Sequence, residues 1–215
     1  MSMNILLIWC VIAYLIGSIP FGYILVKLFL KQDVRKQGSG NIGATNVLRT
    51  GGKKLALATY VLDITKVWIP MLLFNVIMNP INDMPSDILL SSLMIVGGTG
   101  VIGHMYSCWL KFNGGKGVAS FTGFCAWLFP YSAIIGIFVF LIIAFSTKIV
   151  SIASLIGIIA AGIYVIFYVF PILDTPTQLM LVSKIFFIFI ILLIFVRHKG
   201  NIARLMKGEE NKVKF

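Results

Sequence analysis

Seven apolar segments follow one another along the chain, and only short polar stretches separate them. They cover residues 4–26, 55–78, 88–110, 118–129, 131–145, 149–170 and 179–196. A helix needs about 20 apolar residues to cross a bilayer, and 59% of the chain is hydrophobic while only 12% is charged. Because only helices and closed barrels satisfy their backbone groups inside lipid, the pattern predicts an all-α integral membrane protein. Residues 1–215 are expected to form a single polytopic membrane domain.

The fourth and fifth segments are shorter than a usual span, and Pro130 separates them. Two arrangements fit: a pair of crossing helices joined by a tight outer turn, or one re-entrant hairpin. The crossing pair is favoured because unpaired backbone groups in lipid are costly. We therefore predict seven transmembrane helices.

Basic residues alternate between the loops. Sixteen of the 18 Lys and Arg residues fall in the first, third and fifth loops and in the tail, whereas the intervening loops hold Asp83, Asp87 and Asp174 and no basic residue. Cytoplasmic loops carry the excess of Lys and Arg, so the N-terminus is predicted outside and the C-terminus in the cytoplasm. The formal net charge of +11 then marks one cytoplasmic face, which suits anionic headgroups or phosphorylated metabolites rather than nucleic acid.

The first basic loop contains GSGNIGATNVLR, which starts at Gly38. Its glycines Gly38, Gly40 and Gly43 permit positive φ and bring N–H groups close to a ligand. The neutral hydrogen-bonding side chains among them are Ser39, Asn41, Thr45 and Asn46. Such a strip can form an anion nest, although glycines also simply turn a chain. Their occurrence beside cations on one face favours the anion site.

Two further sequences on the same side, FNGGKG and RHKGNIAR, carry similar groups. Gly114, Gly115 and Lys116 directly precede an apolar helix, so an anion there would meet free N–H groups, a helix dipole and a lysine. His198, Asn201 and Arg204 recur at three-residue intervals, which places them on one helix face. A lone interfacial histidine is more often a solvated bystander, but this stripe beside the other loops indicates a ligand site.

Other polar residues have competing interpretations. Ser151 and Ser154 form a further polar pair at helical spacing, yet serines also pack well between helices. His104 is expected to have a structural hydrogen-bonding role. Asp63 and Lys66 lie inside the second segment, where an ionisable pair is a functional candidate; mutual neutralisation explains the pair equally well, and support of a neighbouring loop is only slightly favoured.

Two features are expected to serve packing. Residues 98–103 match G-x-G-x-x-G, but they lie inside an apolar segment and no acidic residue follows about 20 positions on. Close helix packing is the better interpretation. The three cysteines lack metal-ligand spacing and are also interpreted as packing residues.

With these motifs assembled, the chain resembles the bacterial acyl-phosphate:glycerol-3-phosphate acyltransferase family, PlsY. GSGNIGATNVLR, GHMYSCWLKFNGGKGVAS and HKGNIAR are similar to its three cytoplasmic motifs, although Ser107 stands where a proline is usual. The resemblance implies seven spans with the N-terminus outside, in a bacterial cell membrane. It also implies transfer of a fatty acyl group from long-chain acyl phosphate to position 1 of glycerol 3-phosphate, which yields lysophosphatidic acid.

The resemblance assigns roles residue by residue. The reaction site is expected to contain Ser39, Arg49, Lys116, Ser151, His198 and Asn201, and phosphate is expected to be held by Asn41, Gly43, Thr45 and Asn46. Gly114, Gly115 and Arg204 join the substrate-binding set. Neither a metal nor another cofactor is expected. His198 is either a general base or a group that orients the acceptor hydroxyl.

The competing function is an organic-phosphate transporter or channel, because cationic loops and polar pairs within spans suit transport too. Two observations oppose it: the phosphate-binding features gather at one membrane face, and the sequence shows no inverted repeat beyond the short GGKK and GGKG echoes. A non-catalytic binder of lipid headgroups would need the cationic face but not the glycine nests.

Overall fold

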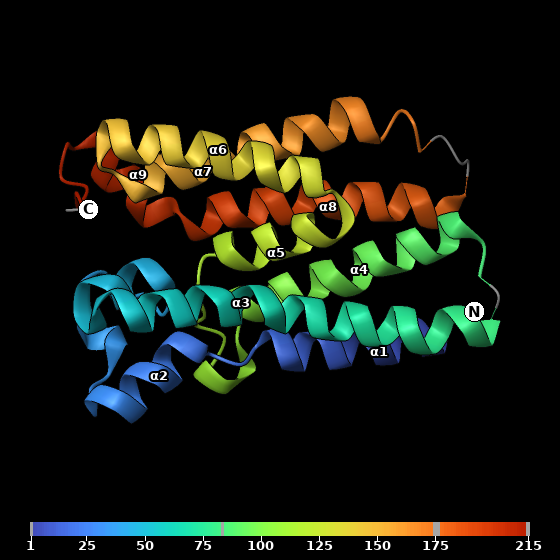
Figure 1. The fold of residues 1–215 in the computed structure, drawn as a ribbon, viewed down its shortest axis with the longest axis horizontal. Coiled ribbons are helices and arrows are strands. Elements are labelled where there is room, and N and C mark those ends of the chain that lie inside the picture. Colours follow the sequence, from blue (N-terminus) through green and yellow to red (C-terminus); the bar gives the residue numbers. More distant parts are fainter. Residues whose placement is uncertain (1, 83, 174–176, 214–215) are drawn as a thin grey trace.

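The computed structural model describes residues 2–82, 84–173 and 177–213, which form a bundle of helices along one long axis (Figure 1). The helices are α1 (Met3–Gly17), α2 (Phe21–Leu30), α3 (Ala44–Asn82), α4 (Ser86–Met105), α5 (Val118–Leu128), α6 (Pro130–Thr147), α7 (Val150–Tyr164), α8 (Gln178–Arg197) and α9 (Lys199–Met206). Short 3-10 turns lie at Val34–Lys36 and Cys108–Leu110, and a π-helical turn, Val165–Val169, extends α7. The all-α prediction is confirmed for the described residues.

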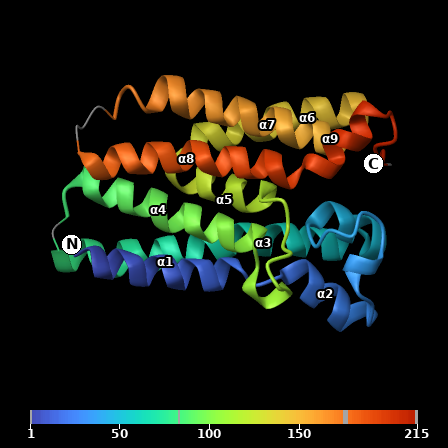
Figure 2. The same ribbon diagram turned by 180° about the vertical axis from the view of Figure 1, so that it is seen from behind.

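Six helical stretches are long and apolar enough to cross a membrane: Met3–Leu30, Ala44–Met78, Ser86–Leu110, Pro130–Thr147, Val150–Val169 and Gln178–Arg197. The fourth apolar segment, residues 118–129, forms α5, whose 11 residues extend about 16 Å at ~1.5 Å per residue. That is roughly half of the ~30 Å hydrocarbon core. The turn that joins α5 to α6 lies short of the bundle end at which the N-terminus lies (Figure 1 and Figure 2). The described residues thus contain six candidate spans and one shorter apolar helix.

Two predicted spans have different bounds in the structure. The first is interrupted between Gly17 and Phe21, where Pro20 has no N–H with which to continue a helix. The second begins earlier than predicted, at Ala44, and kinks at Gly52, where φ is 79°. The N-terminal part of α3 therefore belongs to the polar loop region and brings that loop into contact with the bundle.

Glycines allow α1 and α4 to pack closely. A Cβ atom at Gly103 would overlap the Tyr14 carbonyl, and one at Gly17 would overlap the backbone of Gly100. Gly98 lies against Ile190 of α8. The close-packing interpretation of residues 98–103 is confirmed.

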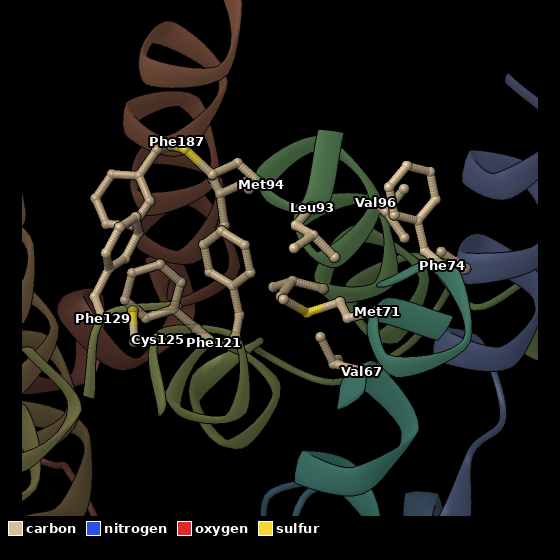
Figure 3. Packing of buried hydrophobic residues seen from close by; sticks show 14 of the residues in the cluster. Val67, Met71, Phe74, Leu93, Met94, Val96, Phe121, Cys125, Phe129 and Phe187 are labelled. Atoms are coloured by element: carbon tan, nitrogen blue, oxygen red, sulfur yellow. The ribbon is translucent and has the colours of Figure 1, made fainter. Parts of the chain in front are cut away.

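Aromatic side chains fill the core between α5 and α8. Phe187 packs against Phe121, Phe124, Phe129 and Phe170 with ring centroids 5.6–6.0 Å apart, and Figure 3 shows three of these rings beside the methionines and branched side chains of α3 and α4. A second cluster packs the first polar loop onto the bundle and contains Val26, Val34, Ile42, Val47, Ala56 and Leu110. α2, α9 and the C-terminal residues lie at one end of the bundle, and the N-terminus lies at the other (Figure 1).

Candidate active site

A cavity of about 460 Å³ opens at the end of the bundle that carries α9 and the polar loops. Its polar part is lined by Ser39, Asn41, Gly43, Thr45, Asn46, Arg49, Lys116, Ser151, His198, Asn201 and Glu210. The structure therefore brings together residues from four separate stretches of sequence, including every residue predicted to be catalytic. An apolar part continues between α5, α6 and α7.

Asn46 holds the first loop in shape. Its side chain is buried, its Oδ1 accepts a hydrogen bond from the Ser39 N–H at 2.8 Å, and its Nδ2 donates to the carbonyls of Val34, Gln37 and Asn41 at 2.8–3.0 Å. Gly38 has a φ of 54°, and a Cβ atom there would overlap Asn46 Oδ1. Asn46 lines the cavity, but its amide is engaged by the loop itself, so its role is to shape the loop.

The rest of the first loop presents hydrogen-bonding groups to the cavity. The Gly43 N–H donates to Asn41 Oδ1 at 2.9 Å, which fixes the turn that starts α3. Thr45 and Ser39 line the cavity beside Arg49, which comes from the second turn of α3. The Arg49 guanidinium also lies 3.5 Å from the carbonyl of Asn211 in the C-terminal tail.

Gly114 and Gly115 do not line the cavity, in contrast to their predicted binding role. Their N–H groups donate to the carbonyls of Met105 and His104 at 3.2 and 2.9 Å, so these N–H groups are not free for an anion. A Cβ atom at Gly115 would overlap His104 Nε2. The two glycines instead let the loop lie directly on the end of α4.

Arg197 clamps the same loop from the opposite side. Its Nη2 and Nε donate to the carbonyls of Gly114 and Gly115 at 2.8 and 3.1 Å, and its guanidinium lies 5.2 Å from the centroid of the Tyr106 ring. Lys116 is the next residue along, and it does line the cavity. Burial lowers the pKa of Lys116 to about 8, against the opposing effect of the Glu210 charge.

A buried polar cluster stands behind this loop. Lys66 Nζ lies 2.8 Å from Asp63 Oδ1 and donates to the Ile19 carbonyl at 2.9 Å, and His104 Nδ1 lies 3.5 Å from the same carboxylate oxygen. The His104 carbonyl accepts the Gly115 N–H. The Asp63–Lys66 pair thus neutralises itself, and Asp63 and His104 also line the cavity. The backbone carbonyl of His104 supports the loop, whereas the hydrogen-bonding role predicted for its side chain stays a prediction, because its Nδ1 has no hydrogen-bond partner among the described residues.

His198 terminates α8 and faces the cavity. Its side chain is buried, and its Nδ1 lies 2.8 Å from the Ile194 carbonyl. That contact requires a proton on Nδ1 and leaves Nε2 of the neutral ring as an acceptor. Burial lowers the pKa of His198 to about 4, and the nearby Lys116 charge acts in the same direction. The ring is therefore neutral near pH 7.

Glu210 is a site residue that the sequence analysis missed. Its carboxylate accepts hydrogen bonds from Asn201 Nδ2 at 2.6 Å, Arg204 Nε at 2.7 Å and Ser151 Oγ at 3.0 Å. Burial alone would raise the pKa of Glu210, but these three hydrogen bonds outweigh it and lower the pKa. Arg204 does not line the cavity and acts through this carboxylate. The available signal was an acidic pair, Glu209 and Glu210, within an otherwise basic tail.

Comparison with known proteins agrees with this arrangement. The family model described as glycerol-3-phosphate acyltransferase matches residues 7–208. A glycerol-3-phosphate acyltransferase of Bartonella henselae is 41% identical over 202 residues, which cover 94% of this chain and 89% of the relative. One from Pelagibacter ubique is 40% identical and covers 94% of both chains.

Two solved structures are similar along nearly the whole chain. The crystal structure of PlsY, an integral membrane glycerol 3-phosphate acyltransferase, in its glycerol 3-phosphate form has a TM-score of 0.81 and 34% identity, and the match covers 97% of this chain and 96% of that one. The lysophosphatidic acid form has a TM-score of 0.79 and 33% identity, with 97% and 95% covered. On the family match, the identities and the shared fold, the chain belongs to the glycerol-3-phosphate acyltransferase family, PlsY.

Proposed function

We propose that this acyltransferase moves a fatty acyl group from acyl phosphate to the 1-hydroxyl of glycerol 3-phosphate, and that it does so in the cavity described above. One observation carries the proposal: a single cavity joins a cationic, hydrogen-bonding part to an apolar part between helices. The substrates match these two parts: both carry a phosphate group, which suits the cationic part, and the donor also carries an acyl chain, which suits the apolar part. The solved relatives were crystallised in glycerol 3-phosphate and lysophosphatidic acid forms.

The cationic part suits two phosphate groups. Arg49 and Lys116 supply positive charge, and the hydroxyl groups of Ser39 and Thr45 supply neutral donors. The first turn of α5 also borders the cavity, and the N–H groups of a first turn have no acceptors within their own helix. Hydrogen bonds that involve charge are about twice as strong as neutral ones, so the cations contribute most of the phosphate affinity.

The reaction needs no protein nucleophile, since acyl phosphate is a mixed anhydride with a good leaving group. The 1-hydroxyl oxygen attacks the acyl carbonyl carbon, the bond from that carbon to the phosphate oxygen breaks, and phosphate leaves. The hydroxyl proton passes to the departing phosphate. The protein orients the reactants and stabilises the developing oxyanion.

His198 is assigned to orientation of the acceptor. Its Nε2 can accept a hydrogen bond from the glycerol hydroxyl, because Nδ1 is committed to the Ile194 carbonyl. A general base works best when its pKa lies near the operating pH, and the pKa of His198 is about 4. The ring is therefore a better hydrogen-bond acceptor than proton acceptor. Asn201 lies beside it and is held by Glu210.

We also propose that the protein crosses a bacterial cell membrane with the N-terminus outside and the active site on the cytoplasmic face, in seven spans. Support comes from the basic residues in alternate loops and from the two ends of the chain at opposite ends of the bundle (Figure 2). The phosphate-binding groups gather at one end of the bundle and not at its middle, which favours an enzyme over a phosphate transporter.

Product formation tests the function directly. Purified protein incubated with hexadecanoyl phosphate and glycerol 3-phosphate is expected to form lysophosphatidic acid and inorganic phosphate. Hexadecanoyl-CoA is expected to fail as donor, because the described residues offer no soluble domain for a bulky nucleotide. If the thioester supported comparable turnover with no acyl phosphate formed, the donor assignment would be wrong.

A further inference from the structure

The apolar part of the cavity ends at three small residues. α5 and α7 run away from the polar end and α6 returns toward it, so the lining residues farthest from that end are Cys125 on α5, Ala133 on α6 and Ala161 on α7. Their exposed fractions are 1%, 6% and 4%. From Ser151 to Ala161 the lined face of α7 extends about 15 Å at ~1.5 Å per residue.

A wall of aromatic side chains adjoins this end of the cavity, beside Cys125 and one helical turn before Ala133. Phe129 and Phe170 pack against Phe187 with ring centroids 5.9 and 5.6 Å apart, and Figure 3 shows Cys125 with Phe129 and Phe187 in this cluster. Ser132 Oγ donates to the Ala161 carbonyl at 3.0 Å, which ties α6 to α7 at the same depth.

α6 and α7 are also in close backbone contact at this depth, so there is no space between them. A Cβ atom at Gly157 would lie 2.7 Å from the Gly136 carbonyl, and one at Gly136 would lie 3.0 Å from the Ala161 Cβ. Well-packed interiors resist insertion of even one methylene group. A chain that reaches the wall therefore has no further room along α7.

We propose that Cys125, Ala133 and Ala161 determine which acyl-chain length the site accepts. This inference rests on the proposed function, because it takes the apolar part of the cavity as the acyl site. The small side chains leave space for the end of a long chain, and the aromatic wall sets the limit. A larger side chain at this depth excludes the last carbons of a long chain while a short chain still fits.

The test compares hexadecanoyl and decanoyl phosphate as donors. Ala133→Leu is expected to lower the ratio of kcat/KM for hexadecanoyl over decanoyl phosphate by about tenfold or more, since a methylene-sized misfit in an apolar pocket costs at least that. Cys125→Ala enlarges the end of the apolar part of the cavity and is expected to raise the ratio of kcat/KM for hexadecanoyl over decanoyl phosphate by roughly threefold. Ile134→Phe is the matched control, because Ile134 is 61% exposed on the outer face of α6, and its ratio should equal that of the wild type.

The outcomes separate the two proposals. Wild-type protein that acylates glycerol 3-phosphate from both donors, with a ratio that neither Ala133→Leu nor Cys125→Ala shifts, would overturn the length determinant alone. Equal losses on both donors in Ala133→Leu, with an unchanged ratio in Cys125→Ala, would overturn it as well. Wild-type protein that uses neither donor would overturn the proposed function, and the length determinant with it. Turnover of decanoyl phosphate by each variant also reports that the variant is folded.

Discussion

Asn201 donates a 2.6 Å hydrogen bond to the Glu210 carboxylate, and both residues line the cavity. The same carboxylate accepts from Ser151 and Arg204, so one acidic side chain holds three polar residues that come from α7 and α9. The tail that carries it is itself anchored, because the Val213 N–H donates to the Lys148 carbonyl at 2.9 Å. Glu210 thus acts as a positioning residue between α7, α9 and the tail.

Glu210→Ala is expected to lower kcat/KM for glycerol 3-phosphate by about ten- to a hundredfold, since hydrogen bonds to a charged group contribute roughly 1.5–3 kcal/mol. Glu210→Gln retains one acceptor oxygen but loses the charge opposite Arg204, so a smaller loss is expected. Steady-state kinetics and thermal unfolding in detergent measure the two effects. The control is Glu209→Gln, which changes an exposed neighbour and should behave as wild type. Faster turnover in Glu210→Ala would mean that the carboxylate competes with the substrate.

Arg197 is predicted to control the position of Lys116. Arg197→Gln removes the charged donors to the carbonyls of Gly114 and Gly115, so the loop loosens and KM for glycerol 3-phosphate is expected to rise about tenfold or more. KM for acyl phosphate should change less if the loop mainly holds the acceptor. Arg197→Lys keeps the charge but not the two-pronged geometry and should recover part of the loss.

The control for this prediction is Lys199→Gln, which removes an exposed charge two residues away. A rise in KM of equal size in Lys199→Gln would show that general electrostatic attraction, and not loop position, governs substrate affinity at this end of the bundle.

Membrane topology can be tested with single cysteines in a background that lacks Cys10, Cys108 and Cys125. Ser86→Cys lies at an exposed position at the start of α4, next to the connection from α3. It is expected to react with an impermeant thiol reagent from outside the cell. Gln32→Cys, in the first basic loop, is expected to react only after permeabilisation. The reverse pattern would invert the proposed orientation.

The α5–α6 turn needs its own cysteine, because α5 is only 11 residues long. Tyr131→Cys replaces a residue that is 68% exposed at the start of α6. Labelling from outside would support two crossing helices and seven spans. Protection from the reagent on both sides would indicate a re-entrant hairpin within the bilayer. The N-terminus would still lie outside and the C-terminus in the cytoplasm, because a hairpin in place of two spans keeps the number of spans odd.

Sequence patterns predicted the parts of the molecule that local composition controls. Apolar segments locate the helices because every backbone group in lipid must be satisfied within its own segment, and the motif residues Ser39, Arg49, Lys116, His198 and Asn201 do meet at one cavity. What a motif does not specify is the partner of each polar group. Asn46 could as well have contacted a ligand as its own loop, and only the folded loop shows that its amide is used internally.

The same limit applies to Gly114, Gly115 and Glu210. A glycine pair before a helix is compatible with an anion nest and with close approach of two backbones, and the second depends on where α4 ends. Glu210 is joined to Ser151 across 59 residues, a contact that no local spacing encodes. The length of α5, in contrast, follows the short apolar segment predicted at residues 118–129; hydropathy does not report whether the turn to α6 reaches the far side of the membrane.

The pH dependence of activity should follow Lys116 and not His198. The pKa of Lys116 is about 8, so its positive charge is present below that pH and is lost as the pH rises through it. We therefore expect kcat/KM for glycerol 3-phosphate, which reports groups of the free enzyme, to fall above about pH 8. Lys116→Arg should move this fall to higher pH, because arginine stays protonated. Lys116→Met should lower activity by about ten- to a hundredfold below pH 8 and should remove the fall, because methionine carries no charge at any pH.

His198, whose pKa is about 4, is neutral from about pH 5 upward and should add no inflection near pH 6.5. His198→Gln can still offer an oxygen acceptor to the glycerol hydroxyl, so appreciable activity is expected to remain, with the same profile between pH 6 and 8 as the wild type. A wild-type inflection near pH 6.5 that persists when the donor is varied and disappears in His198→Gln would contradict this expectation. It would show that His198 titrates in the working range and takes the hydroxyl proton itself, in place of the departing phosphate.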